Sequence, residues 1–116
     1  GLPRQRLISR VSTMADLLTE EEILARLSGA AAWERRGSEI CREIRFAGFP
    51  AAMRFVNAIA EAAEAANHHP DIDIRWSTVR LALSTHSQGG LTDRDFAMAR
   101  TIDALAEGTA RAGNRA

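Results

Sequence analysis

The sequence predicts a single α+β domain with the element order α-β-β-α-β-β-α. The chain has 116 residues, which is enough for one hydrophobic core of ordinary size and too few for two. Apolar residues recur at helical spacing in three segments. Between these helices lie two pairs of shorter segments in which apolar and polar residues alternate, as they do in strands.

The first helix has a clear start and a clear stop. Thr19 and Glu22 have the spacing of a capping box, in which each side chain bonds the other residue's backbone N–H. Gly29 follows the last apolar residue and ends the pattern. We therefore expect a helix over about residues 19–28.

The first pair of strands surrounds a Gly-Ser dipeptide. Residues 33–36 and 39–46 are expected to form two strands, with a tight turn at residues 37–38 between them. Arg42 interrupts the alternation of the second strand.

The second helix is the longest one predicted from the apolar pattern. Pro50 suits its first turn, and helical spacing continues to Asn67. Pro70 disfavours helical backbone at the residue before it. His68 and His69 are therefore expected to leave the helix as an extended stub.

The second pair of strands is predicted over residues 72–76 and 79–83. A turn at residues 77–78 places all their apolar side chains on one face, as does a register shifted by two. The unshifted register, continued beyond the strands, puts His69 opposite His86. Directly opposed residues have Cβ atoms about 4.5–5.5 Å apart.

Thr92 is expected to cap the last helix, whose apolar stripe ends near residues 105–106.

We interpret residues 1–13 as a flexible N-terminal extension, residues 14–107 as the folded domain and residues 108–116 as a flexible C-terminal tail.

Composition excludes several classes of function. The 15 basic residues balance 15 acidic ones, which disfavours binding to nucleic acid or to an acidic membrane. The sequence contains no lysine and no tyrosine, so Schiff-base lysines and tyrosyl nucleophiles are excluded. The single cysteine, Cys41, cannot form an internal disulfide and fits a reducing compartment such as the cytoplasm. No apolar stretch approaches the ~18 residues of a membrane span.

The three histidines are the strongest candidates for chemistry. A histidine considered alone is usually a surface or structural residue, but here at least two are expected at one end of the sheet. A zinc site is disfavoured because His68 and His69 are adjacent in extended chain and point to opposite faces. General acid–base catalysis tolerates divergent imidazoles. Glu64 lies one helical turn before His68 and is expected to orient that ring, although an exposed helix-face carboxylate is an alternative.

These residues occur in a pattern that resembles the pterin-4a-carbinolamine dehydratase family. The resemblance covers about residues 19–106, and His-His-Pro followed at this spacing by Ser-Thr-His is its most specific part. The motif residues are Glu64, His68, His69, Pro70, Trp76, the run Leu83-Ser84-Thr85-His86 and the run from Gly90 to Asp95.

The resemblance implies a four-stranded antiparallel sheet with helices packed on one face, assembled as a homodimer or homotetramer. It also implies a hydro-lyase that dehydrates 4a-hydroxytetrahydropterin in tetrahydropterin recycling, without metal or organic cofactor. His68 and His86 match the family's acid and base, and His69 matches a histidine that contributes more to binding. By the same resemblance the expected substrate-binding residues are Glu64, Pro70, Trp76, Arg94 and Asp95.

Some of these positions have simpler explanations. Trp76 suits a core position in the hairpin, and Asp95 suits a helix cap. Asn67 departs from relatives that carry an acid there, but asparagine is also common at helix ends. An alternative function is a binding module, because animal members of the family also dimerise with a transcription factor. A metal-binding protein is a third possibility.

Overall fold

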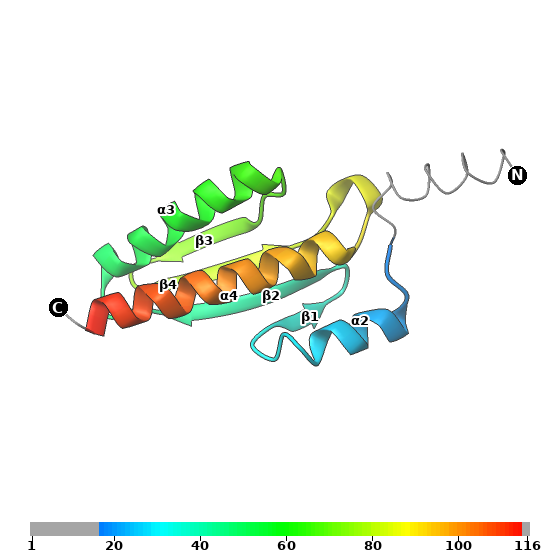
Figure 1. Cartoon of the computed structure of the whole chain (residues 1–116), viewed down its shortest axis with the longest axis horizontal. Helices are drawn as coiled ribbons and strands as arrows, with labels where there is room; N and C mark the ends of the chain where they lie inside the picture. The colour runs from blue at the N-terminus through cyan, green and yellow to red at the C-terminus, as the bar shows by residue number, and fades with distance from the viewer. Residues whose placement is uncertain (1–16, 115–116) are drawn as a thin grey trace, which may run out of the picture.

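The computed structural model describes residues 17–114 and confirms the predicted α+β fold. Its elements are α2 (Glu20–Leu27), β1 (Glu34–Arg36), β2 (Glu39–Arg45), α3 (Phe49–Ala66), β3 (Asp71–Arg75), β4 (Thr78–Leu83), the 3-10 turn η1 (His86–Gln88) and α4 (Asp93–Asn114). The strands form one antiparallel sheet in the order β1-β2-β4-β3, and α3 and α4 lie across one of its faces (Figure 1). The expected extension over residues 1–13 lies outside the described residues.

The core lies between the sheet and these helices. Alternate residues of the two central strands point into it, as a sheet with one covered face requires. The largest apolar side chains that are fully buried are Ile40, Val79, Leu81 and Leu83 from the sheet, Phe55 and Ile59 from α3, and Phe96 and Ile102 from α4. The Thr19–Glu22 capping box is present, and α2 adds Ile23 to the same core.

Arg42 interrupts the alternation of β2 because it has a partner on the covered face. It lies opposite Leu81, among the residues that point toward the helices. Its guanidinium donates a hydrogen bond to the carboxylate of Asp103 on α4, and Trp33 Nε1 donates to the same oxygen over 2.8 Å. The charge therefore sits at the core boundary with an acid to match it.

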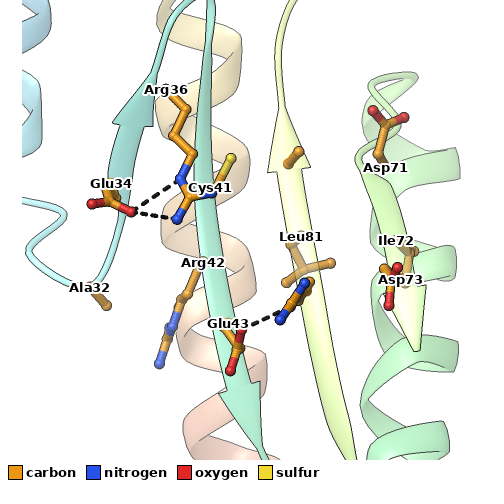
Figure 2. A pocket seen from close by; sticks show the side chains of 12 residues that line it. Ala32, Glu34, Arg36, Cys41, Arg42, Glu43, Asp71, Ile72, Asp73 and Leu81 are labelled. Carbon is orange, nitrogen blue, oxygen red and sulfur yellow. Dashed lines mark hydrogen bonds and ion pairs between the residues drawn. The ribbon is translucent and has the colours of Figure 1, made fainter. Parts of the chain in front are cut away.

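Within residues 17–114, no helix covers the other face of the sheet, which is polar. A pocket of about 410 Å³ opens on this face. Figure 2 shows its lining side chains, with helices behind the strands. Arg36 donates to Glu34 over 3.0 Å, and Arg80 donates to Glu43 over 2.8 Å. The small residues Cys41 and Ala82 are also part of the pocket lining. This open face therefore carries charged side chains that pair with one another around two small residues.

The second hairpin differs from the predicted turn. Ile72 pairs with Leu81, which is the register shifted by two that also keeps the apolar side chains on one face. The turn is therefore Trp76-Ser77, and Trp76 adopts a φ of 56°. Trp76 is 76% exposed, so the core position considered for it is wrong.

The last helix is longer than its apolar stripe. α4 continues to Asn114, beyond the expected end near residues 105–106. Arg111 and Glu107 form an ion pair in this extra length. Within residues 17–114, none of the helices combines the length and apolarity needed to cross a membrane.

Candidate active site

The end of α3 sends the two adjacent histidines in different directions. Asn67 adopts the left-handed conformation, with a φ of 52° and a ψ of 44°, and asparagine tolerates this better than most residues. The His68 N–H then bonds the carbonyl of Ala63 over 3.1 Å, and the chain continues through Pro70 into β3. His68 is buried, whereas His69 is exposed. Asn67 thus has the helix-end role that its sequence position indicated.

His68 is held by a buried carboxylate. Its Nε2 lies 2.6 Å from Oδ1 of Asp95, a side chain that has no solvent exposure. The second oxygen of Asp95 accepts hydrogen bonds from Thr85 Oγ1 over 2.8 Å and from the Thr92 N–H over 2.9 Å. Asp95 therefore caps α4 and bonds His68 at the same time.

Glu64 contacts His69 and not His68. Its Oε2 lies 2.6 Å from Nε2 of His69, and both side chains are largely exposed. The expectation that Glu64 orients His68 is wrong, because Asn67 ends the helix and turns His68 toward the interior. The next residue, His69, is the one whose ring contacts Glu64 in the last turn of α3.

His86 enters the site from the segment that follows β4, whereas His68 and His69 lie between α3 and β3. It begins η1, directly after Thr85, whose N–H bonds the carbonyl of Gly90 over 2.8 Å. Gly89 closes this short loop with a φ of 76°, which suits glycine. The observed hairpin register, continued outward, sets Ser84 and not His86 opposite His69, so the expected direct opposition of His69 and His86 is wrong.

Arg94 joins the two sides of the site. It lies in the first turn of α4, and its Nη2 donates to the Asn67 carbonyl over 2.7 Å. This bond ties the start of α4 to the end of α3.

The three histidines still line one pocket, which we call the histidine pocket. It has a volume of about 310 Å³, and its lining residues are Asn67, His68, His69, Ser84, Thr85, His86, Ser87 and Arg94. Asp95 lies behind His68, and Glu64 lies beside His69 outside the lining. Pro70 shapes the chain after His69 without lining the pocket. Trp76 lies at the far end of β3, so the structure does not bring it to the histidines.

Two other pockets of the described chain contain none of the histidines. One is the open-face pocket of Figure 2, where acids and bases pair with one another. The other, of about 740 Å³, lies between β2, the start of α3 and the C-terminal half of α4. Imidazoles suited to proton transfer line only the histidine pocket among these three.

A shared metal ion does not fit the histidine geometry. The Nε2 atoms of His68 and His69 each face their own carboxylate, on different sides of the chain. In residues 17–114, no three side chains of histidine, cysteine, aspartate or glutamate converge as ion ligands.

Sequence reasoning missed the hydroxyl groups of the site. Thr85 and Thr92 are buried, and their hydroxyl oxygens lie 2.7 Å apart. Ser84 and Ser87 are also part of the pocket lining. Thr85 was inside the recognised Ser-Thr-His run, and Thr92 had been predicted only as a helix cap.

The model of the family described as pterin 4 alpha carbinolamine dehydratase matches residues 16–105. The chain belongs to this family. A relative from Nocardia farcinica, which is named after this family, is 55% identical over 91 residues, covering 78% of this chain and 96% of the relative. Another, from Acidobacterium capsulatum, is 57% identical over 88 residues, covering 76% and 96% of the two chains.

Solved structures agree with this family membership. A transcriptional coactivator/pterin dehydratase from Brucella melitensis superposes with a TM-score of 0.76 at 33% identity, covering 78% of this chain and 99% of that one. A pterin dehydratase-like protein, described as a RuBisCO assembly factor of the alpha-carboxysome, has a TM-score of 0.54 and 23% identity, covering 64% and 86%. The second comparison shows that the dehydratase fold is shared, and nothing more.

Proposed function

We propose that this member of the dehydratase family removes water from a 4a-hydroxytetrahydropterin by histidine acid–base catalysis. The observation that carries the proposal is the convergence of His68, His69 and His86 on one pocket of about 310 Å³. An imidazole has an ordinary pKa of about 6.5, so it can give or take a proton near neutral pH.

The reaction needs two proton transfers. The hydroxyl on C4a leaves as water after it receives a proton, and N5 loses its proton as the C4a–N5 double bond forms. The product is a quinonoid dihydropterin, which a reductase-type reaction returns to the tetrahydro form. Neither transfer calls for a metal or an organic cofactor, because side-chain acids and bases can perform both.

The pocket offers a group for each requirement. His68 and His86 are proposed as the acid and base, and His69 is proposed to contribute to catalysis chiefly by binding substrate. Arg94 can donate to a pterin carbonyl from the guanidinium nitrogens that do not bond Asn67. Asp95 acts on substrate through His68, since its own side chain is fully buried.

The remaining predicted contacts are indirect in this chain. Glu64 is proposed to hold the His69 ring, with which it already pairs. Pro70 is proposed to fix the chain direction after His69. Substrate binding by Trp76 has no support from the geometry of a single chain, because Trp76 lies at the opposite end of β3.

The direct test follows decay of an enzymatically generated carbinolamine by absorbance. His68→Ala and His86→Ala should each slow dehydration by about 10²-fold or more if each ring transfers a proton. Arg54→Ala, an exposed substitution on α3, serves as the control and should leave the rate unchanged. Circular dichroism should show that all variants fold. Unchanged turnover in both histidine variants would overturn the proposal.

One relative gives a reason to keep the binding-module alternative. The Brucella melitensis protein is described as both a coactivator and a dehydratase. The alternative places function on a helix surface, so it predicts that the histidine substitutions leave partner binding and function intact. The carbinolamine assay distinguishes the two, since a pure binding module would not accelerate dehydration at all.

The proposal also includes assembly and location. We expect a homodimer or homotetramer, as the family resemblance implies, and a cytoplasmic location, which suits the single free Cys41. Sedimentation of the purified chain tests the first of these expectations.

A further inference from the structure

The buried hydroxyl groups behind His68 form a directional chain of hydrogen bonds. The Thr92 N–H can only donate, and it does so to Oδ2 of Asp95 over 2.9 Å. The Thr85 hydroxyl donates to the same oxygen over 2.8 Å. A threonine hydroxyl has one proton, and that of Thr85 is donated to Asp95. In the contact of 2.7 Å between the two hydroxyls, Thr92 is therefore the donor and Thr85 the acceptor.

This direction fixes the role of Asp95. Its Oδ2 accepts two hydrogen bonds, one from the Thr92 N–H, which can only donate, and one from the Thr85 hydroxyl. The carboxylate is thus held as an acceptor, and Oδ1 faces Nε2 of His68 at 2.6 Å. A carboxylate that accepts at this atom places the proton of the neutral imidazole on Nε2.

The other nitrogen of His68 is then the free one. Nδ1 has no hydrogen-bond partner among residues 17–114, although no buried side-chain nitrogen or oxygen of this part of the chain is left without a partner. Nδ1 therefore keeps some exposure, and His68 is one of the residues that line the histidine pocket. The lone pair of Nδ1 is available to a bound molecule.

We propose that Thr85 and Thr92 are positioning residues that hold His68 in the tautomer protonated on Nε2, so that Nδ1 accepts the proton from the substrate. The inference rests on the proposed dehydration. That reaction gives up one proton from the substrate framework, the one on N5. As the N5–H bond breaks, its electron pair forms the C4a–N5 double bond, and the proton moves to Nδ1 of His68.

The leaving hydroxyl needs a separate donor under this assignment. The C4a–O bond breaks with its electrons on oxygen, and a proton from a second imidazole converts it to water. His86 is an exposed ring of the pocket and supplies that proton, in agreement with its proposed role. After the product leaves, His68 releases its proton to solvent, and the imidazole that protonated the hydroxyl takes up a proton from solvent, so protons balance over one turnover.

The tautomer can be measured without substrate. Long-range ¹⁵N–¹H correlation spectra of histidine-labelled protein at a pH where His68 is neutral distinguish protonated Nε2 from protonated Nδ1. The wild-type spectrum should show His68 with its proton on Nε2. A wild-type His68 protonated on Nδ1 would overturn the inference without any variant.

Two substitutions test the role of the hydroxyls. Thr92→Val and Thr85→Val each remove one link of the chain and should give His68 a mixed tautomer signal. The kcat for carbinolamine dehydration should fall by about 10-fold or more while KM stays within about twofold, because valine has nearly the same shape as threonine. Thr85→Ser and Thr92→Ser keep the hydroxyl and should restore both readouts.

Thr101→Val is the matched control. Thr101 is also a helix threonine, but its exposed hydroxyl bonds only the Ala97 carbonyl. Loss of kcat in the valine variants with the Nε2 tautomer intact would contradict the positioning role. If wild-type protein shows the Nε2 tautomer and no dehydratase activity, the proposed function fails while the hydrogen-bond assignment stands.

Discussion

Glu64 Oε2 lies 2.6 Å from His69 Nε2, and the pair sits at the exposed rim of the histidine pocket. The pair exists because Asn67 ends α3 in a left-handed conformation and turns His69 back over the last helical turn. His68 and His69 each have a carboxylate on Nε2, but one carboxylate is buried and the other is in solvent. Their contributions to catalysis should differ accordingly.

Glu64→Gln should affect binding more than turnover. Exposed ion pairs contribute at most about 1 kcal/mol, which corresponds to roughly a fivefold change. We expect KM for the carbinolamine to rise by up to about fivefold, with kcat nearly unchanged. Glu61→Gln, one turn earlier on an exposed part of the same helix, is the control. A fall in kcat as large as that of His68→Ala would show that Glu64 acts in proton transfer.

Removal of metal should leave dehydration intact. The Nε2 atoms of His68 and His69 each face a carboxylate, which leaves these rings poorly placed to share an ion. Protein dialysed against EDTA should therefore retain its rate of carbinolamine decay. Elemental analysis of the same sample checks that metal was removed. Inactivation that added zinc reverses would contradict the acid–base assignment.

Asp103→Ala should destabilise the fold. Asp103 accepts from Trp33 Nε1 and from Arg42, whose side chain is only 20% exposed, so the substitution leaves two donors short of a partner. The free energy of unfolding should fall by about 1–3 kcal/mol. Urea titration measures it. Asp73→Ala removes an exposed partner of Arg75 and should cost at most about 1 kcal/mol. Equal losses in the two variants would contradict this explanation of Arg42.

Asp93→Asn should destabilise the protein near neutral pH and not in strong acid. A hydrogen bond of 2.7 Å from Arg26 lowers the pKa of Asp93 from its ordinary value of 3.8. A lowered pKa in the folded state gives stability above the unfolded value, and that stability is lost as pH falls through the folded value. The pair is exposed, so the deficit at pH 7 should be at most about 1 kcal/mol.

Urea titrations at pH 7 and in a series of buffers descending below pH 3.8 would follow this deficit. It should shrink over the acidic part of the series, because the wild-type carboxylate becomes neutral there. Asp71→Asn is the control, because Asp71, the first residue of β3, forms no ion pair with any residue of 17–114. A deficit that remains constant down the series would contradict the Arg26–Asp93 contribution.

Local sequence signals predicted the elements but not every contact between them. The Thr19–Glu22 capping box and the turn after Arg36 follow from adjacent residues, and both are confirmed. Arg42 could not be explained from β2, because its partner Asp103 is 61 positions away. The turn at Trp76 was missed because a bulky residue rarely takes a positive φ.

The site was partly predictable for a similar reason. His68, His69 and His86 all follow or precede strands at one end of the sheet, so a register shifted by two still left them around one pocket. The pairing of Glu64 with His69 depends on the backbone at Asn67, which sequence spacing alone does not define. The bond between the Thr85 and Thr92 hydroxyls depends on how the intervening loop closes.

The two tryptophans of this tyrosine-free chain occupy opposite environments, with Trp33 5% exposed and Trp76 76% exposed. Intrinsic fluorescence excited in the near ultraviolet therefore comes from one sheltered indole and one wetted indole. A soluble quencher such as acrylamide would extinguish the emission of Trp76 first and leave a blue-shifted remainder from Trp33. The protein thus carries its own pair of optical reporters, one for global unfolding and one for events at the hairpin tip.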